Sequence, residues 1–290
     1  MKIRLLLLAI MFFLFSNLNS LLSQLESETN PLEPGFTTSR IYLGPVAGYN
    51  RSLHTVDLSS FAEDPLCPFF TNGSGNGFFV GFFYEQFIGG LMSKHSIVAR
   101  VLYNVLPASL TKEGDTYPSQ VEDPNDPQKT TIVYSSTRHS VNVDYNLLSL
   151  DIMYKFRVAG GLVLTVGPTF DVPMTKNLQQ KYELIEPNYV KFKRDEEAIR
   201  TKGYQYINND RTIIVYDGDI ARNYPGKATQ ETSAGFRFGL KGGIQYEIVT
   251  GNIFDIIPGV FYNLGLTNAT DAQSWKVNAL QIGVDIRFAL

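Results

Sequence analysis

The sequence predicts an all-β protein, an eight-stranded antiparallel transmembrane β-barrel with long extracellular loops and short periplasmic turns. Three observations lead to this fold class. The N-terminus has the pattern of an export signal, no later stretch is apolar over the length of a spanning helix, and eight segments alternate in polarity with a period of two. The 16 Tyr and 20 Phe together outnumber the 25 Lys and Arg, as expected for a barrel with aromatic girdles.

The first residues predict export. Lys2 and Arg4 precede an apolar stretch over residues 5–15, and small polar residues follow it. This order is that of a secretory signal peptide, and the stretch is shorter than the roughly 20 residues that a membrane helix needs. We expect the signal peptide to cover residues 1–23, with cleavage after Ser23 or, alternatively, after Ser20. Residues 24–39 would then be a short periplasmic segment, and residues 40–290 the outer-membrane barrel.

The connections between the predicted strands alternate between short and long. They cover residues 40–50, 77–88, 96–106, 141–157, 161–172, 234–248, 253–266 and 275–290. Short connections follow the second, fourth and sixth strands, whereas residues 51–76, 107–140 and 173–233 are long and polar, and residues 267–274 are an intermediate case. Short periplasmic turns and long outer loops are the outer-membrane pattern. A soluble periplasmic β-sandwich, the competing interpretation, gives no reason for this sorting.

The two faces of the strands differ as lipid and lumen should. In the last strand Leu280, Ile282 and Val284 share one face, and Asp285 and Arg287 lie on the other. The same alternation in the other strands predicts an interior polar network: Glu85, Arg100, Asp151, Lys155, Arg237, Lys241, Glu247, Asp285 and Arg287. An eight-stranded barrel is just wide enough for its side chains to fill it. We therefore expect paired charges that fill the lumen, and a polar pathway or switch is the alternative.

Two further features of the strands lead to predictions. Six tyrosines near strand ends suit interfacial girdles, although ordinary packing would explain them equally: Tyr49, Tyr84, Tyr103, Tyr154, Tyr246 and Tyr262. The alternation of the fourth strand breaks near Leu147 and Leu148, which predicts a bulge or a register change there.

Several strand motifs resemble a known family. Residues 145–156 are similar to its Tyr-Leu-x-x-Pro-Leu…Tyr-x-Phe strand, with Ser149 where proline is usual. Gly167-Pro168, the pair Gly235 and Gly239, and residues 262–268 follow in the order of the family. The chain thus resembles the PorT-like outer-membrane barrels of Bacteroidetes over about residues 40–290. Because that family includes a protein required for type IX secretion, the resemblance implies a component of that machinery as one alternative.

The C-terminus resembles the signal that the barrel-assembly machinery recognises. The pattern has a polar residue, a glycine and two apolar residues, which here are Gln281, Gly283, Ile286 and Phe288. The chain departs from the pattern by ending in Phe-Ala-Leu rather than on the aromatic residue.

Candidate catalytic groups are few. Outer-membrane hydrolases resemble one another in a His-x-Ser pair on one strand face, whereas here His95-Ser96 and His139-Ser140 are adjacent and should point oppositely. His54 falls in the first predicted loop, without a serine two residues on. We therefore expect no enzyme, no metal site and no cofactor, and keep a lipid-modifying hydrolase as the minor alternative. Cys67 is the single cysteine, so no intrachain disulfide can form.

The long loop at residues 173–233 is the strongest candidate for function, since long loops without structure of their own are uncommon unless functional. Residues 204–207 and 211–216 flank Asn208-Asn209-Asp210, which predicts a β-hairpin beyond the membrane. Aromatic residues occur throughout the loop, as at binding surfaces, and the candidate binding residues are Tyr189, Phe192, Tyr204, Tyr206 and Tyr216. A folded extracellular cap is the preferred interpretation, and a mobile loop the alternative.

Together these features predict a non-enzymatic protein of the bacterial outer membrane. It would act in surface binding, or as a scaffold or accessory subunit of an envelope complex. The expected partners are outer-membrane lipid and lipopolysaccharide, the barrel-assembly machinery and other envelope proteins. Nucleic acid is excluded as a partner, because the formal net charge is −3 and no basic face is clustered.

Overall fold

The computed structural model describes residues 41–58, 70–88, 93–123, 125–223, 230–250, 254–271 and 273–290. All of them belong to one compact unit, Ser39–Leu290. The predicted signal peptide and periplasmic segment, residues 1–39, lie outside the described residues, as does Cys67.

The described chain is almost entirely antiparallel β-sheet. Its strands are β1 (Ile41–Leu58), β2 (Phe70–Phe87), β3 (His95–Val105), β4 (Ala108–Asp123), β5 (Asp126–Ala159), β6 (Leu162–Glu186), β7 (Gln205–Ile207), β8 (Thr212–Asp219), β9 (Arg237–Tyr246), β10 (Phe254–Gly265) and β11 (Trp275–Ala289). A short helix, α2 (Glu196–Lys202), precedes β7.

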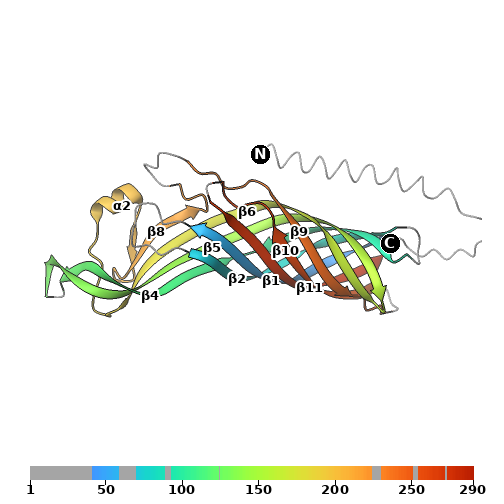
Figure 1. The fold of residues 1–290 in the computed structure, drawn as a ribbon, viewed down its shortest axis with the longest axis horizontal. Coiled ribbons are helices and arrows are strands. Elements are labelled where there is room, and N and C mark those ends of the chain that lie inside the picture. The colour runs from blue at the N-terminus through green and yellow to red at the C-terminus, as the bar shows by residue number, and fades with distance from the viewer. Residues whose placement is uncertain are drawn as a thin grey trace, which may run out of the picture. The chain divides into compact units, whose positions relative to one another are not determined.

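Eight of these strands pair in a closed ring, in the order β1, β2, β3, β5, β6, β9, β10, β11 and back to β1 (Figure 1). These are the eight predicted strands, so the predicted all-β antiparallel fold class is confirmed. In the closed ring each strand lies between two neighbours. The backbone N–H and C=O groups of the ring strands can therefore pair on both sides. The first and last strands, β1 and β11, close the ring over a register from Tyr42↔Ala289 to Val56↔Trp275.

The sheet extends well beyond the ring, and here the predicted loop boundaries were wrong. β5 is 34 residues long and β6 is 25, so both continue into segments predicted as loops. β4 pairs with β5 from Ala108↔Val143 to Asp123↔Asp126, and β8 pairs with β6 from Asn177↔Asp219 to Glu183↔Thr212. The sheet therefore has eleven strands, of which the eight predicted ones form the ring. We call this extension, residues 108–143 and 174–223, the head.

The head has a hydrophobic core of its own. Leu184, Val190, Phe192 and Ile213 are buried together, and Val133 of β5 packs against them. The predicted hairpin is confirmed, because β7 and β8 pair from Gln205↔Ile214 to Ile207↔Thr212. Its turn residues Asn208, Asn209 and Asp210 have φ of 55°, 56° and 60°, a conformation that Asn and Asp tolerate. The long third loop is thus a folded element over its described residues 173–223.

The predicted irregularity near Leu147 is confirmed as a register shift between β5 and β6. Asn146 pairs with Thr175 and Leu147 with Pro173, which leaves Met174 as the extra residue on β6. Proline cannot donate to a strand ladder and is therefore found at bulges. The alternation of β5 itself continues, since Leu147 is buried and Leu148 is exposed.

Candidate functional site

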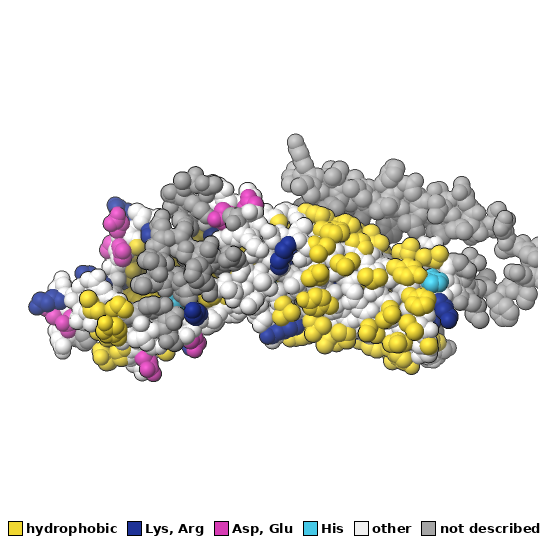
Figure 2. All heavy atoms as spheres, viewed as in Figure 1, with side chains coloured by type: hydrophobic (Ala, Val, Ile, Leu, Met, Phe, Trp, Pro, Cys, Tyr) yellow, Lys and Arg dark blue, Asp and Glu magenta, His cyan; other side chains and the backbone are white. Residues whose placement is uncertain are grey.

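The outer face of the ring is apolar. Exposed large hydrophobic side chains occupy alternate positions of every ring strand, and on β11 they are Leu280, Ile282, Val284, Ile286 and Phe288. They form a broad hydrophobic surface over the ring strands, whereas charged side chains gather over the head (Figure 2). Contiguous apolar surfaces of this size are rare on soluble monomers and mark contact with a membrane or a protein. The outward face predicted for β11 is therefore confirmed.

The six tyrosines near strand ends all point away from the lumen. Tyr49, Tyr103, Tyr154, Tyr246 and Tyr262 are exposed, and Tyr84 is half-buried. Their position on the outer face is compatible with the predicted interfacial girdles, since a tyrosine there presents an apolar ring with a polar tip.

The inside of the ring is charged, and its largest cluster lies where β5 turns into β6. Lys155 Nζ lies 2.9 Å from Glu85 Oε1 and 2.7 Å from Glu247 Oε1. Arg287 bridges Glu247 at 3.0 Å and Asp255 at 2.7 Å. These buried charges are paired on several sides at once, which offsets much of the cost of removing them from water.

Further pairs follow along the lumen toward the head. Arg100 lies 2.5 Å from Asp285, which also accepts a hydrogen bond of 2.9 Å from Gln245. Lys241 lies 2.5 Å from Asp151. Arg237 lies 3.9 Å from Asp171 and donates to the Val277 carbonyl at 2.9 Å.

All nine residues of the predicted interior network are buried. Sequence reasoning missed three partners, namely Asp171, Arg157 and Asp255. Asp171 continues the inward alternation of β6 and could have been found from it. With these three, the network among the described residues has six cations and six anions: Arg100, Lys155, Arg157, Arg237, Lys241 and Arg287 against Glu85, Asp151, Asp171, Glu247, Asp255 and Asp285. The lumen is filled by a neutral network of ion pairs.

Uncharged polar side chains also occupy the lumen. Gln281, part of the predicted assembly signal, donates to Asn50 at 2.7 Å and to Asn104 at 2.9 Å. An apolar cluster then closes the lumen at its junction with the head: Val56, Phe70, Leu106, Ala108, Leu110, Val141, Val143, Tyr145, Leu147, Leu178, Ile220, Ala269, Trp275, Val277 and Ala279.

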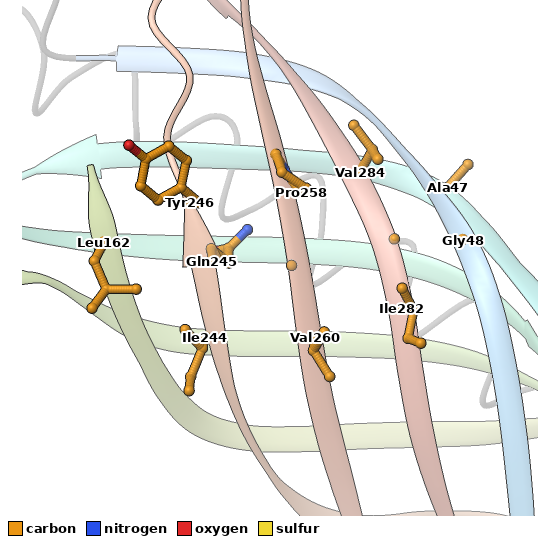
Figure 3. Close-up of a pocket in the computed structure, with 12 residues that line it drawn as sticks. Ala47, Gly48, Leu162, Ile244, Gln245, Tyr246, Pro258, Val260, Ile282 and Val284 are labelled. Carbon is orange, nitrogen blue, oxygen red and sulfur yellow. The ribbon is translucent and has the colours of Figure 1, made fainter. Parts of the chain in front are cut away.

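Glycines on β1 and β11 face the side chain of Phe79. A Cβ on Gly48 or Gly283 would lie 2.5 or 2.4 Å from Phe79 Cζ, so these glycines make room for the ring inside the lumen. On the outer side of these strands lies an apolar groove of about 640 Å³ (Figure 3). Its lining comes from β1, β6, β9, β10 and β11 and includes Leu162, Ile244, Val260, Ile282 and Val284. The groove belongs to the apolar outer face.

The histidines take three different positions. His54, predicted in a loop, lies in β1 and is buried; its Nε2 contacts the Leu106 carbonyl at 3.1 Å and its Nδ1 accepts from Trp275 at 3.1 Å. His95 is exposed whereas Ser96 is buried, so their side chains point oppositely as expected. His139 is buried in the head and stacks on Tyr182 with ring centroids 4.2 Å apart.

Most of the candidate binding residues of the long loop belong to the core of the head. Phe192 is 6% exposed, Tyr204 and Tyr206 pack against the head core, and Tyr216 packs against the apolar cluster at the junction. Tyr189, at 66% exposure, is the one of the five that is largely available to a partner. The other four aromatic rings are less available because the β7–β8 hairpin packs against β5 and β6, and the rings lie in that contact.

No helix in the described ranges is both long and apolar enough to cross a membrane. Within the same ranges, no three His, Cys, Asp or Glu side chains lie close enough together to hold a metal ion.

The chain matches no protein-family model and no curated protein. Among solved structures it is similar to Ail, the attachment invasion locus protein of Yersinia pestis, at 10% identity over 85% of this chain and 98% of that chain, with a TM-score of 0.33. It is similar to Neisserial surface protein A at 11% identity over 87% and 99%, with a TM-score of 0.34. The outer membrane protein AlkL in DMPC bilayers gives 13% identity over 91% and 96%, with a TM-score of 0.35. Because these TM-scores are low, the fold rests on the strand pairings of this chain, and the PorT-like resemblance stays a prediction.

Proposed function

We propose that this protein is a non-enzymatic β-barrel of the bacterial outer membrane that presents a rigid, folded head at the cell surface for binding. The observation that carries the proposal is the inversion of polarity in the ring: apolar side chains point outward and paired charges point inward. A soluble protein buries its apolar residues, whereas a membrane barrel exposes them to lipid and keeps polar groups inside.

The filled lumen supports binding rather than transport. The ion pairs occupy the ring along its length, and the apolar cluster around Leu110, Leu178 and Trp275 closes its end beneath the head. When side chains fill the interior of an eight-stranded ring, no room is left for a solute path. The ring therefore serves as an anchor, and the part of the chain left for recognition is the head.

Cysteine labelling on intact cells tests this arrangement. In a Cys67→Ser background, we introduce Lys193→Cys in the head, Ala159→Cys at the β5–β6 turn and Ile282→Cys on the outer face; all three positions are exposed. A membrane-impermeant maleimide should label Lys193→Cys on intact cells and Ala159→Cys only after the outer membrane is permeabilised. Ile282→Cys should resist the reagent until the protein is unfolded. Labelling of Ala159→Cys but not of Lys193→Cys on intact cells would invert the topology.

The proposal that the protein is not an enzyme has a separate test. Phospholipid and lipid A acyl profiles should be identical in outer membranes with and without the protein. An acyl chain that is lost only when the protein is present, and is retained in a folded His139→Ala variant, would replace this proposal by a lipid hydrolase.

A further inference from the structure

One strand of the head has an edge that its neighbour does not cover. β5 is flanked by β4 and β6, but the pairing with β6 begins at Ser136↔Glu186. Residues 130–135 pair with β4 on their other side only, as far as the described residues show. Every second residue of such an edge directs its N–H and C=O outward, which is a ready template for another extended chain.

The sequence explains why β6 leaves this edge open. Pro187 follows the last residue of β6 and has no N–H with which to continue the ladder. Arg211 then holds the departing chain: its guanidinium donates to the carbonyls of Leu184 at 2.8 Å, Ile185 at 2.9 Å and Pro187 at 3.2 Å. The chain therefore turns into the head rather than along β5.

Pro127 and the exposed Lys129 lie just before the open edge, but residues 130–135 themselves lack the features that usually protect one. Exposed edge strands normally carry lysine, proline or a bulge that prevents pairing with other chains. Residues 130–135 read Thr-Thr-Ile-Val-Tyr-Ser, without a charge or a proline and with strong β-propensity. Ile132 and Tyr134 are 70% and 72% exposed on one face of this strand, and they lie in the head, away from the apolar face of the ring.

The edge is also held in place from behind. Val133, on the opposite face of the strand from Ile132 and Tyr134, packs against the core of Leu184, Val190, Phe192 and Ile213. Ser135 and Thr137 are fully buried on the same side. A strand fixed in this way loses little conformational freedom when a partner adds to it, which favours binding.

We propose that residues 130–135 of β5 bind an extended, uncharged peptide segment of another protein by β-strand addition. Main-chain hydrogen bonds would provide the affinity, and apolar side chains at alternate positions of the peptide would contact Ile132 and Tyr134. This inference deepens the proposed function by naming the site on the head and the chemistry of its partner.

The test uses the purified full chain in detergent micelles and a fluorescent peptide, Thr-Val-Thr-Val-Thr-Val-Thr with one terminal lysine. A matched peptide carries N-methyl groups at alternate residues, which removes the N–H groups of one edge. We expect saturable binding of the first peptide, measured by fluorescence anisotropy, and none of the second. Equal binding of both peptides, or of neither, would overturn the proposal.

Variants locate the site. Ile132→Lys/Tyr134→Lys should weaken binding by roughly tenfold or more, because two cross-strand apolar contacts are lost. Ile207→Lys, which changes an exposed apolar residue of β7, is the matched control and should bind as the wild type does. Hydrogen–deuterium exchange of wild-type residues 130–135 should slow when the peptide is added. Protection elsewhere would refute the site even if the double variant failed to fold.

A second copy of the chain is the competing occupant. A wild-type dimer that dissociates in Ile132→Lys/Tyr134→Lys would assign the edge to self-association and overturn the peptide partner. Because these measurements use micelles, they do not depend on localisation. The labelling pattern on cells would stand if peptide binding failed, and peptide binding would stand if the labelling pattern failed.

Discussion

Lys241 Nζ lies 2.5 Å from Asp151 Oδ2, and both side chains are completely buried inside the ring. The two residues come from β9 and β5, which are separated by β6, so the pair spans the inner face of three neighbouring strands. A buried pair of this kind ties the strands to one register, because a shift by one residue would turn either charge toward the outer face.

Loss of one partner from this pair should destabilise the ring. Lys241→Met leaves Asp151 buried without its cation, at a cost of about 3–5 kcal/mol in the free energy of unfolding. The double variant Lys241→Met/Asp151→Leu removes both charges and should recover most of this loss. Urea unfolding in lipid vesicles, followed by heat-modifiable migration, measures both effects. Equal stability of the single variant and the wild type would contradict the ion-pair network.

A charge on the outer face near the C-terminus should impair assembly. Phe288 is exposed on the outer face of β11 and also belongs to the predicted assembly signal. We expect Phe288→Asp to lower the amount of folded protein in the outer membrane, since a charge that faces lipid is costly. Phe288→Leu, which stays apolar, is the control. Wild-type levels of folded Phe288→Asp would argue against lipid contact at this position.

Removal of the outer part of the head should leave the ring intact. Deletion of the whole predicted loop, residues 173–233, would also remove the end of β6, all of β8 and the buried Ile220. Residues 187–211 are a better choice, because Glu183↔Thr212 pairing holds the flanking strands together. A Gly/Ser linker of about five residues can close this gap, and loop closure depends only weakly on length.

We expect this deletion variant to fold and insert, with unchanged heat-modifiable migration. Its head should be more sensitive to protease, because the deletion removes Val190 and Phe192 from the head core. An unfolded ring in this variant would show that the ring depends on the head. A peptide-binding assay on the same variant would report whether the open edge of β5 needs that core behind it.

High pH should weaken the head through Tyr216. Burial, with a contribution from Asp219, raises the pKa of Tyr216 from 10.0 to about 12, and its hydroxyl donates to the Asp219 carbonyl at 2.8 Å. The unfolded chain therefore loses this proton first, so the stability of the head should fall as the pH rises from about 10 toward 12. The urea midpoint of the head, followed by a fluorophore at Lys193→Cys, measures the slope.

Tyr216→Phe has no proton to lose and should show a shallower decline over the same pH range. Tyr189→Phe, at an exposed position, serves as the control and should keep the wild-type slope. An unchanged slope in Tyr216→Phe would mean that another group governs the alkaline stability of the head.

The sequence by itself determined the ring strands and their faces. Alternation with a period of two is a local property, so Leu280 and Ile282 could be placed outside, and Asp285 and Arg287 inside, without knowledge of any neighbour. The β7–β8 hairpin was equally predictable, because Asn208, Asn209 and Asp210 favour the conformation of its turn. The register shift near Leu147 was predicted at the right place, but its extra residue, Met174, lies on β6 and the alternation of β5 is unbroken.

Only the tertiary structure decided how far the strands extend and which groups meet. The segment that forms β4 has no alternation that separates it from a polar loop, and its strand exists because β5 lies beside it. Which carboxylate pairs with Lys155 or Arg287, and why Phe192 is core rather than surface, depends on strands far apart in the sequence. The open edge of β5 has the same origin: Pro187 ends β6, but only the pairing of β5 with β4 and β6 shows which backbone groups are left uncovered.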